Sequence, residues 1–95
     1  MAIVYILYSK SVDHYYIGYT TESIEIRIEK HLNNFYKNKY TKQAKDWELY
    51  FHIICQTDYQ ARNIEKHIKK MKSRKYITDL TQYPEIAISL LKKYA

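Results

Sequence analysis

The sequence predicts an α+β domain in which three helices flank a small three-stranded antiparallel sheet. Two β-rich runs stand close together near the start, a third apolar run stands in the middle, and helical patterns lie between and after them. The chain has 95 residues with one glycine and one proline, which suits a single hydrophobic core with few loops. We therefore expect one domain over residues 1–95.

The first two strands are expected to form a hairpin. Residues 3–8 are β-branched or aromatic and predict a strand, and residues 15–18 predict a second strand after a polar turn. Because the connection is short, the two should pair in antiparallel fashion. Gly18, the only glycine, ends the second run. We expect it where the backbone needs positive φ or where another group comes close.

A helix and a third strand should follow. Residues 20–22 (Thr-Thr-Glu) indicate a helix start with a threonine N-cap. A helix over about 22–36 is predicted by an apolar stripe: Ile24, Ile28, Leu32 and Phe35. Residues 33–45 are polar and basic and are typical of a loop, whereas residues 47–55 are apolar enough for a strand.

The C-terminal part predicts two more helices. Thr57 and Gln60 have the spacing of a capping box at the start of a helix over about 58–72. Its expected core residues are Ala61, Ile64, Ile68 and Met71. Pro84 marks the first turn of a last helix. That helix should bury Ala87, Leu90, Leu91 and Tyr94.

The composition favours a nucleic-acid partner. The formal net charge is +6 and the isoelectric point about 9.3, which suits a polyanion, nucleic acid before a membrane surface. A single cysteine, Cys55, excludes an internal disulfide and fits a reducing compartment. With no signal peptide and no apolar run of a membrane span, the sequence predicts a soluble cytoplasmic protein.

Several polar side chains are candidates for chemistry. Arg27 and His31, four residues apart on a helix, could bind one phosphate together, or they could belong to a solvated face. Glu65 is the only acid within residues 59–78, among seven basic residues. It could pair with Lys69 or Arg62, or it could hold Mg²⁺ beside a phosphate.

Tyrosine and lysine patterns add two further hypotheses. Tyr5 and Tyr16 could be core aromatics or could include a general base, if a nearby cation lowers the pKa from its ordinary value of about 10. The basic residues around Glu65 could form a solvated face. Their single sign favours contact with a phosphate backbone instead.

In their order along the chain, five elements resemble the GIY-YIG nuclease superfamily: Val4-Tyr5-Ile6, Tyr16-Ile17-Gly18, Arg27, His31 and Glu65. The chain is similar to small single-domain bacterial proteins related to the catalytic domain of the excision-repair nuclease subunit. Residues 45–49, and residues 65–69 together with 72–75, resemble that subgroup as well. The resemblance covers about residues 2–80.

The resemblance implies metal-dependent hydrolysis of a DNA phosphodiester. Glu65 would hold Mg²⁺ or Mn²⁺, and Tyr5 or Tyr16 would activate the attacking water. Arg27 would offset charge in the transition state, and His31 would help to orient the phosphate. DNA contacts are expected from Gly18, Tyr19, Lys42, Arg62, Lys69, Lys72, Arg74 and Lys75.

The chain departs from the family pattern at some positions. The first motif reads Val-Tyr-Ile without its leading glycine, and Tyr19 stands where some members carry lysine. One more residue than usual separates Gly18 from Arg27, which we assign to the turn before the helix. The asparagine that some members carry after the glutamate is missing; Lys72, Arg74 or Lys75 could serve there.

These departures leave an alternative open, a nucleic-acid-binding module whose catalysis is lost or depends on a partner. A weaker alternative is an interaction protein whose basic surface keeps it soluble. For an endonuclease without a further DNA-reading domain, we expect structure-selective or weakly sequence-specific cleavage in DNA repair or processing. We expect no small-molecule cofactor, and a monomer or weak homodimer.

Overall fold

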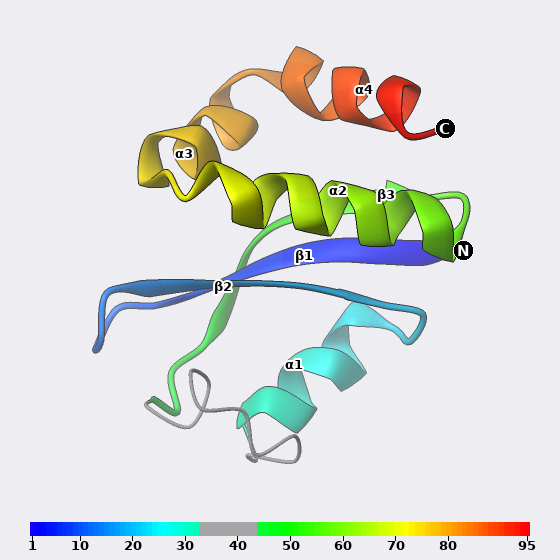
Figure 1. The fold of residues 1–95 in the computed structure, drawn as a ribbon. Helices are drawn as coiled ribbons and strands as arrows, with labels where there is room; N and C mark the ends of the chain where they lie inside the picture. Colours follow the sequence, from blue (N-terminus) through cyan, green and yellow to red (C-terminus); the bar gives the residue numbers. More distant parts are fainter. Residues whose placement is uncertain (33–43) are drawn as a thin grey trace.

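The computed structural model describes residues 1–32 and 44–95, and for Arg27, Lys30, His31 and Leu32 it gives the backbone alone. The described residues form three strands and four helices: β1 (Ala2–Ser9), β2 (His14–Thr20), α1 (Ile24–Leu32), β3 (Glu48–Cys55), α2 (Asp58–Met71), α3 (Arg74–Gln82) and α4 (Pro84–Lys93). The predicted α+β class with a three-stranded antiparallel sheet is confirmed (Figure 1).

Strand β1 lies in the centre of the sheet, in the order β2-β1-β3, and is antiparallel to both neighbours. The expected hairpin of the first two strands is therefore present. Because β1 is covered on both faces, its residues Val4 to Leu7 are at most 1% exposed. This explains why the run is apolar throughout rather than alternating.

Helices cover both faces of the sheet (Figure 1). Helix α2 covers one face, where Val4 and Ile6 join a core with Ile64 and Ile68. Helices α3 and α4 pack on the far side of α2. Helix α1 covers the other face, where a second cluster of buried residues is formed by Tyr5, Leu7, Ala44 and Trp47.

The cap of α2 follows the predicted capping box in part. Thr57 is the N-cap, and its Oγ1 accepts a hydrogen bond from the backbone N–H of Gln60 at 3.1 Å. The Gln60 side chain does not return to Thr57: its Oε1 accepts the N–H of Gln56 at 2.8 Å. Its Nε2 donates to the carbonyl oxygen of Leu91 at 2.9 Å, which ties the start of α2 to α4.

The expectation of three helices is wrong, because α3 forms a fourth within the described chain. Lys72 ends α2 in the left-handed region, with φ of 47°. Ser73 then caps α3 by accepting the N–H of Tyr76 at 3.1 Å. Left-handed C-caps are usually glycine or asparagine, so a lysine at this position masked the break between the two helices.

Helix α1 begins later than predicted, because Thr20 is the last residue of β2 and does not cap the helix. The Oγ1 of Thr20 accepts a hydrogen bond from the N–H of Glu22. It is the Oγ of Ser23 that accepts a hydrogen bond from a helical N–H, that of Ile26, at 3.3 Å. The predicted end of this helix at 33–36 lies outside the described residues. Met71 was expected in the core but is 45% exposed, because its side chain lines the groove between α2 and α4.

Candidate active site

Two tyrosines form the first part of the candidate site, on the face of the sheet that α1 covers. Tyr5 pairs with Gly18 in the sheet register, and its ring lies across that residue. A Cβ at Gly18 would stand 2.6 Å from the Tyr5 hydroxyl oxygen and 2.7 Å from its Cζ. Gly18 does not adopt positive φ. The glycine is therefore required by the close approach of Tyr5, and not by a turn of the backbone.

Tyr16 lies beside Tyr5 on this face, and we call these two side chains the tyrosine wall. It stands two residues before Gly18 on the same face of β2, and its ring centroid is 6.4 Å from that of Tyr5. Tyr5 is fully buried, whereas Tyr16 is half-buried. The rings belong to a core cluster, which agrees with one of the two predicted alternatives. A role as general base stays a prediction.

The helix that carries Arg27 and His31 covers the same wall. Ile24 and Ile28 of α1 pack against the cluster that contains Tyr5 and Tyr16. The backbone of α1 includes both positions 27 and 31, so the expected four-residue helical spacing is present. The side chains of Arg27 and His31, and all of Lys42, lie outside the described part of the chain.

Glu65 lies on α2, over the other face of the sheet. Its side chain is 14% exposed, because its neighbours Ile64 and Ile68 draw this side of the helix into the core. Its Oε1 is 3.3 Å from Nζ of Lys69, whose side chain is 51% exposed. This is the expected i,i+4 ion pair, and such a partly exposed pair stabilises the fold little.

A cationic hollow of about 230 Å³ lies between β2 and the end of α2. Its charged and titratable lining residues are Asp13, His14, Tyr15, Lys69, Lys72 and Arg74. Of the other predicted DNA contacts, Tyr19 packs against the core on this face, and Arg62 is exposed. Lys75 forms an ion pair with Asp79 at 2.9 Å. Contact of any of these residues with DNA stays a prediction.

The level of Glu65 along β2 follows from the direction of α2, which runs opposite to β2 (Figure 1). Lys69 and Ile17 line the same hollow. Glu65 stands one turn earlier in α2, about 6 Å along the helix, while Tyr19 stands about 7 Å beyond Ile17. Because α2 runs opposite to β2, Glu65 lies one helical turn closer than Lys69 to the Thr20 end of β2, on the helix that covers the face of the sheet opposite to Tyr5 and Tyr16.

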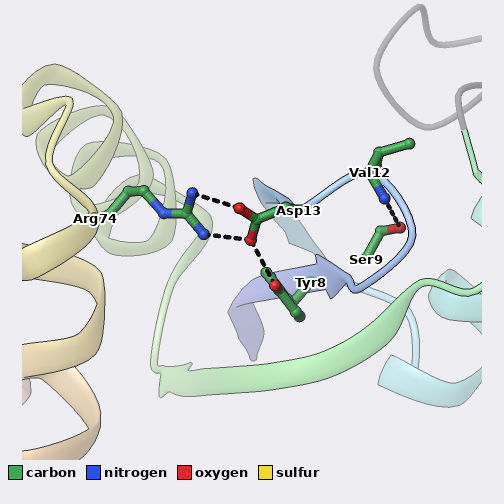
Figure 2. A network of polar contacts seen from close by, with 5 residues as sticks. All are labelled: Tyr8, Ser9, Val12, Asp13 and Arg74. Carbon is green, nitrogen blue, oxygen red and sulfur yellow. Dashed lines mark hydrogen bonds and ion pairs between the residues drawn. The ribbon is translucent and has the colours of Figure 1, made fainter.

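A group of polar contacts that the sequence did not predict holds the β1–β2 turn against α3 (Figure 2). Arg74 donates to both carboxylate oxygens of Asp13, from Nη1 at 3.1 Å and from Nη2 at 2.7 Å. The Tyr8 hydroxyl donates to Asp13 Oδ1 at 2.6 Å. The guanidinium carbon of Arg74 is 5.1 Å from the centre of the Tyr15 ring. We call Tyr8, Asp13, Tyr15 and Arg74 the hairpin clasp.

The hairpin clasp explains two electrostatic features. Hydrogen bonds from Arg74 and then Tyr8 hold the pKa of the Asp13 carboxyl well below its usual range. The bond to Asp13 raises the pKa of the Tyr8 hydroxyl. Asp13 has a left-handed backbone, with φ of 53°, which Asp tolerates better than most residues. Arg74, one of the predicted DNA contacts, is thus bound within the protein by a bidentate contact.

Asp46 holds the same turn from its other side. It accepts hydrogen bonds from Ser9 Oγ at 2.6 Å, from Ser11 Oγ at 2.9 Å and from the Ser11 N–H at 3.0 Å. These bonds, from Ser9 first, lower the pKa of Asp46. The polar composition of residues 9–14 was the available signal in the sequence for these contacts. It did not reveal the partners, since Asp13 and Arg74 are 61 positions apart and Ser9 and Asp46 are 37 positions apart.

The comparison with protein families decides the assignment of these features. The model of the GIY-YIG catalytic domain matches residues 1–77, which run from β1 into α3. The chain belongs to the GIY-YIG family. No curated protein and no solved structure matches it at a significant level. Helix α4 lies beyond the matched residues.

Membership in the GIY-YIG family gives the broad activity. The matched domain is a nuclease domain of the endonuclease class, and DNA is the substrate that it implies. GIY-YIG nucleases generally use divalent metal ions. Within residues 1–32 and 44–95, no helix is long and apolar enough to cross a membrane.

Proposed function

We propose that this GIY-YIG domain is a divalent-metal-dependent DNA endonuclease that hydrolyses phosphodiester bonds. We expect selectivity for DNA structure or weak sequence specificity, and a role in DNA repair or processing. The observation that carries the proposal is the arrangement around the edge strand β2. Tyr5 and Tyr16 stand on one face of the sheet, and Glu65 stands on α2, which covers the other face, with its side chain 14% exposed.

The donor set fits one divalent ion held mainly by Glu65. In the described part of the chain no three acidic, histidine or cysteine side chains gather to hold a metal ion. Mg²⁺ does not require such a cage, since it is commonly held by one or two carboxylates together with water and substrate phosphate. When bound, the ion would supply Lewis-acid polarisation of the scissile phosphate. Glu65 would exchange its exposed partner Lys69 for the ion.

The tyrosine wall supports a role in water activation. A tyrosine hydroxyl has an ordinary pKa of about 10, so it needs nearby positive charge to accept a proton near neutral pH. Arg27 and His31 are on the helix that covers Tyr5 and Tyr16, which puts two candidate cations on the same layer. Either Tyr5 or Tyr16 would take the proton from the attacking water.

The basic residues support a role in holding the substrate. Arg27 would neutralise charge that develops on the phosphate, as a fixed guanidinium does in phosphoryl transfer. Lys69 and Lys72 line the hollow beside β2 and would bind phosphates next to the scissile bond. Such contacts position DNA without reading its sequence, in keeping with weak specificity.

A second candidate function is DNA binding without cleavage. Two of the predicted site residues favour it, because their charges are already paired within the protein. Glu65 is paired with Lys69, and Arg74 is paired with Asp13. If these pairs persist on DNA, the protein would bind phosphate but lack a carboxylate for the metal. The two functions differ in whether metal ions promote strand cleavage.

The test is nicking of a supercoiled plasmid and of branched DNA, with Mg²⁺, with Mn²⁺ and with a chelator. We expect metal-dependent cleavage that is lost in Glu65→Gln, because the amide cannot replace the carboxylate as a metal ligand. Glu48→Gln is the matched control, as Glu48 is exposed at the start of β3. Cleavage that survives Glu65→Gln would refute the assignment, and salt-sensitive binding without cleavage under all conditions would favour the binding module.

A further inference from the structure

A second basic groove lies between α2 and α4. It encloses about 680 Å³, and its lining includes Lys66, Lys70 and Lys93 together with Asn63, His67 and Tyr94. The charged side chains of this lining are all lysines. One acid, Glu85, lies in the adjoining hollow, which shares His67 and Lys93 with the groove.

The floor of the groove is ordered by aromatic contacts. His67 Nδ1 and the Tyr94 hydroxyl are 2.9 Å apart, and their ring centroids are 5.8 Å apart. Lys93 Nζ lies 5.4 Å from the centre of the Tyr94 ring. Lys70 and Lys93 line the groove together with His67.

This groove is separate from the candidate active site. Lys66 and Lys70 are on the side of α2 that faces α4, whereas Glu65 and Lys69 are on the side that faces β2. Lys93 belongs to α4, which lies beyond the residues that match the GIY-YIG catalytic domain. Helix α2 therefore carries lysines on two of its sides. On the side that faces α4, Lys66 and Lys70 are joined by Lys93 of α4, a helix that lies outside the residues matched by the family model.

We propose that the groove between α2 and α4 is a second DNA-binding surface, which holds phosphates of the duplex away from the site of cleavage. Three lysines without an acid in the groove create a positive potential that attracts a polyanion. The Nζ groups, the Asn63 amide and the Tyr94–His67 pair supply hydrogen-bond donors for phosphate oxygens. The choice of DNA rests on the proposed function, since α2 would then contact the same duplex on both sides.

The main test compares neighbouring lysines of α4. Lys93 lines the groove, whereas Lys92 lines a different hollow with Ile54 and Ile88. Binding of a short DNA duplex is measured by fluorescence anisotropy over a range of salt, in the Glu65→Gln background so that no strand is cut. We expect Lys93→Gln to weaken binding about 3-fold or more and to reduce the salt slope by about one. Lys92→Gln should change the Kd less than about 2-fold.

The combined variant Lys66→Gln, Lys70→Gln and Lys93→Gln should reduce the salt slope by about two to three. Equal effects of Lys92→Gln and Lys93→Gln, or a combined variant that keeps the salt slope of the parent protein, would overturn the proposal.

A competition with polyglutamate separates DNA from an acidic protein partner. If polyglutamate occupies the groove and the duplex does not, the proposal is overturned in favour of a protein partner. These measurements do not depend on catalysis. A wild-type protein that nicks no DNA but binds it through Lys93 would overturn the proposed endonuclease and leave the second surface in place.

Discussion

Asp13 and Glu65 are carboxylates of two different regions, the β1–β2 turn and α2, and they have opposite surroundings. Asp13, at the hairpin end, has a side chain that is 61% exposed, yet it binds both Arg74 and Tyr8. Glu65, on α2, is 14% exposed and forms its described ion pair with a half-exposed lysine. Two side-chain partners hold Asp13 in place, so we expect it to act on stability. Our proposal assigns the metal to Glu65, whose described partner is a lysine half exposed to solvent.

The same contrast holds for the tyrosines of the two regions. The Tyr8 hydroxyl is engaged by Asp13 in the hairpin clasp. Tyr5 and Tyr16 lie together on the opposite face, under the helix that carries Arg27. We therefore expect substitutions in the hairpin clasp to act on stability, and substitutions in the middle of β2 to act on cleavage.

The largest expected effect is on catalysis, and it separates the three tyrosines. Removal of the hydroxyl in Tyr5→Phe or Tyr16→Phe should lower kcat by about 10²-fold or more for the residue that acts as general base. Tyr8→Phe, the control from the hairpin clasp, should leave kcat within about 2-fold. The measurement is single-turnover cleavage of a defined DNA substrate. If neither Tyr5→Phe nor Tyr16→Phe slows cleavage, the proposed role of the tyrosine wall is wrong.

Gly18→Ala should damage both stability and cleavage. The new Cβ would collide with the Tyr5 ring, which is fully buried and has little room to move. Overpacking of this kind costs about 1–3 kcal/mol of unfolding free energy. Urea denaturation measures this loss, and Tyr5→Leu in the same chain should recover part of it. Losses that simply add in the double variant would show that the two residues do not interact.

Asp13→Asn and Arg74→Gln should each lower the thermal midpoint by a few degrees at neutral pH. Both break the same contact, so the double variant should resemble either single one. Cleavage at a temperature well below the midpoint should stay close to that of the wild type. A strong loss of cleavage in Arg74→Gln but not in Asp13→Asn would instead assign Arg74 to DNA binding.

The smallest expected effect is the pH dependence of the hairpin clasp. Arg74 lowers the pKa of Asp13 in the folded protein, so the unfolded chain binds a proton first as the pH falls. The stabilisation is complete well above the ordinary aspartate pKa of about 3.9 and is lost as the pH falls below it. The difference in Tm between wild type and Asp13→Asn should therefore shrink from pH 7 to pH 3. A constant difference would contradict this account.

Local patterns accounted for most of the secondary structure. The three strands, the hairpin pairing and the start of α2 at Thr57 agree with the expectations from apolar runs and capping residues. The missed helix α3 and the wrong cap of α1 have local causes too. Lys72 in a left-handed conformation and Ser23 as N-cap gave weaker signals than glycine and the Thr-Thr pair.

The candidate site could be predicted only as a list of residues. Their order identified the family, which the match over residues 1–77 confirms. The sequence did not reveal that Arg74 is held by Asp13, or that Lys75 is paired with Asp79. Among the predicted DNA contacts, Lys69 and Lys72 line the hollow beside β2. Whether they touch DNA stays a prediction.

By itself, the sequence determined the α+β class, the hairpin and the basic charge, because these depend on neighbouring residues and on composition. The tertiary structure alone decided what these residues touch. It showed that Gly18 accommodates the Tyr5 ring, that Asp13 meets Arg74, and that α4 completes a groove with α2. Each of these contacts joins residues from different elements, and the packing of those elements sets the distances between them.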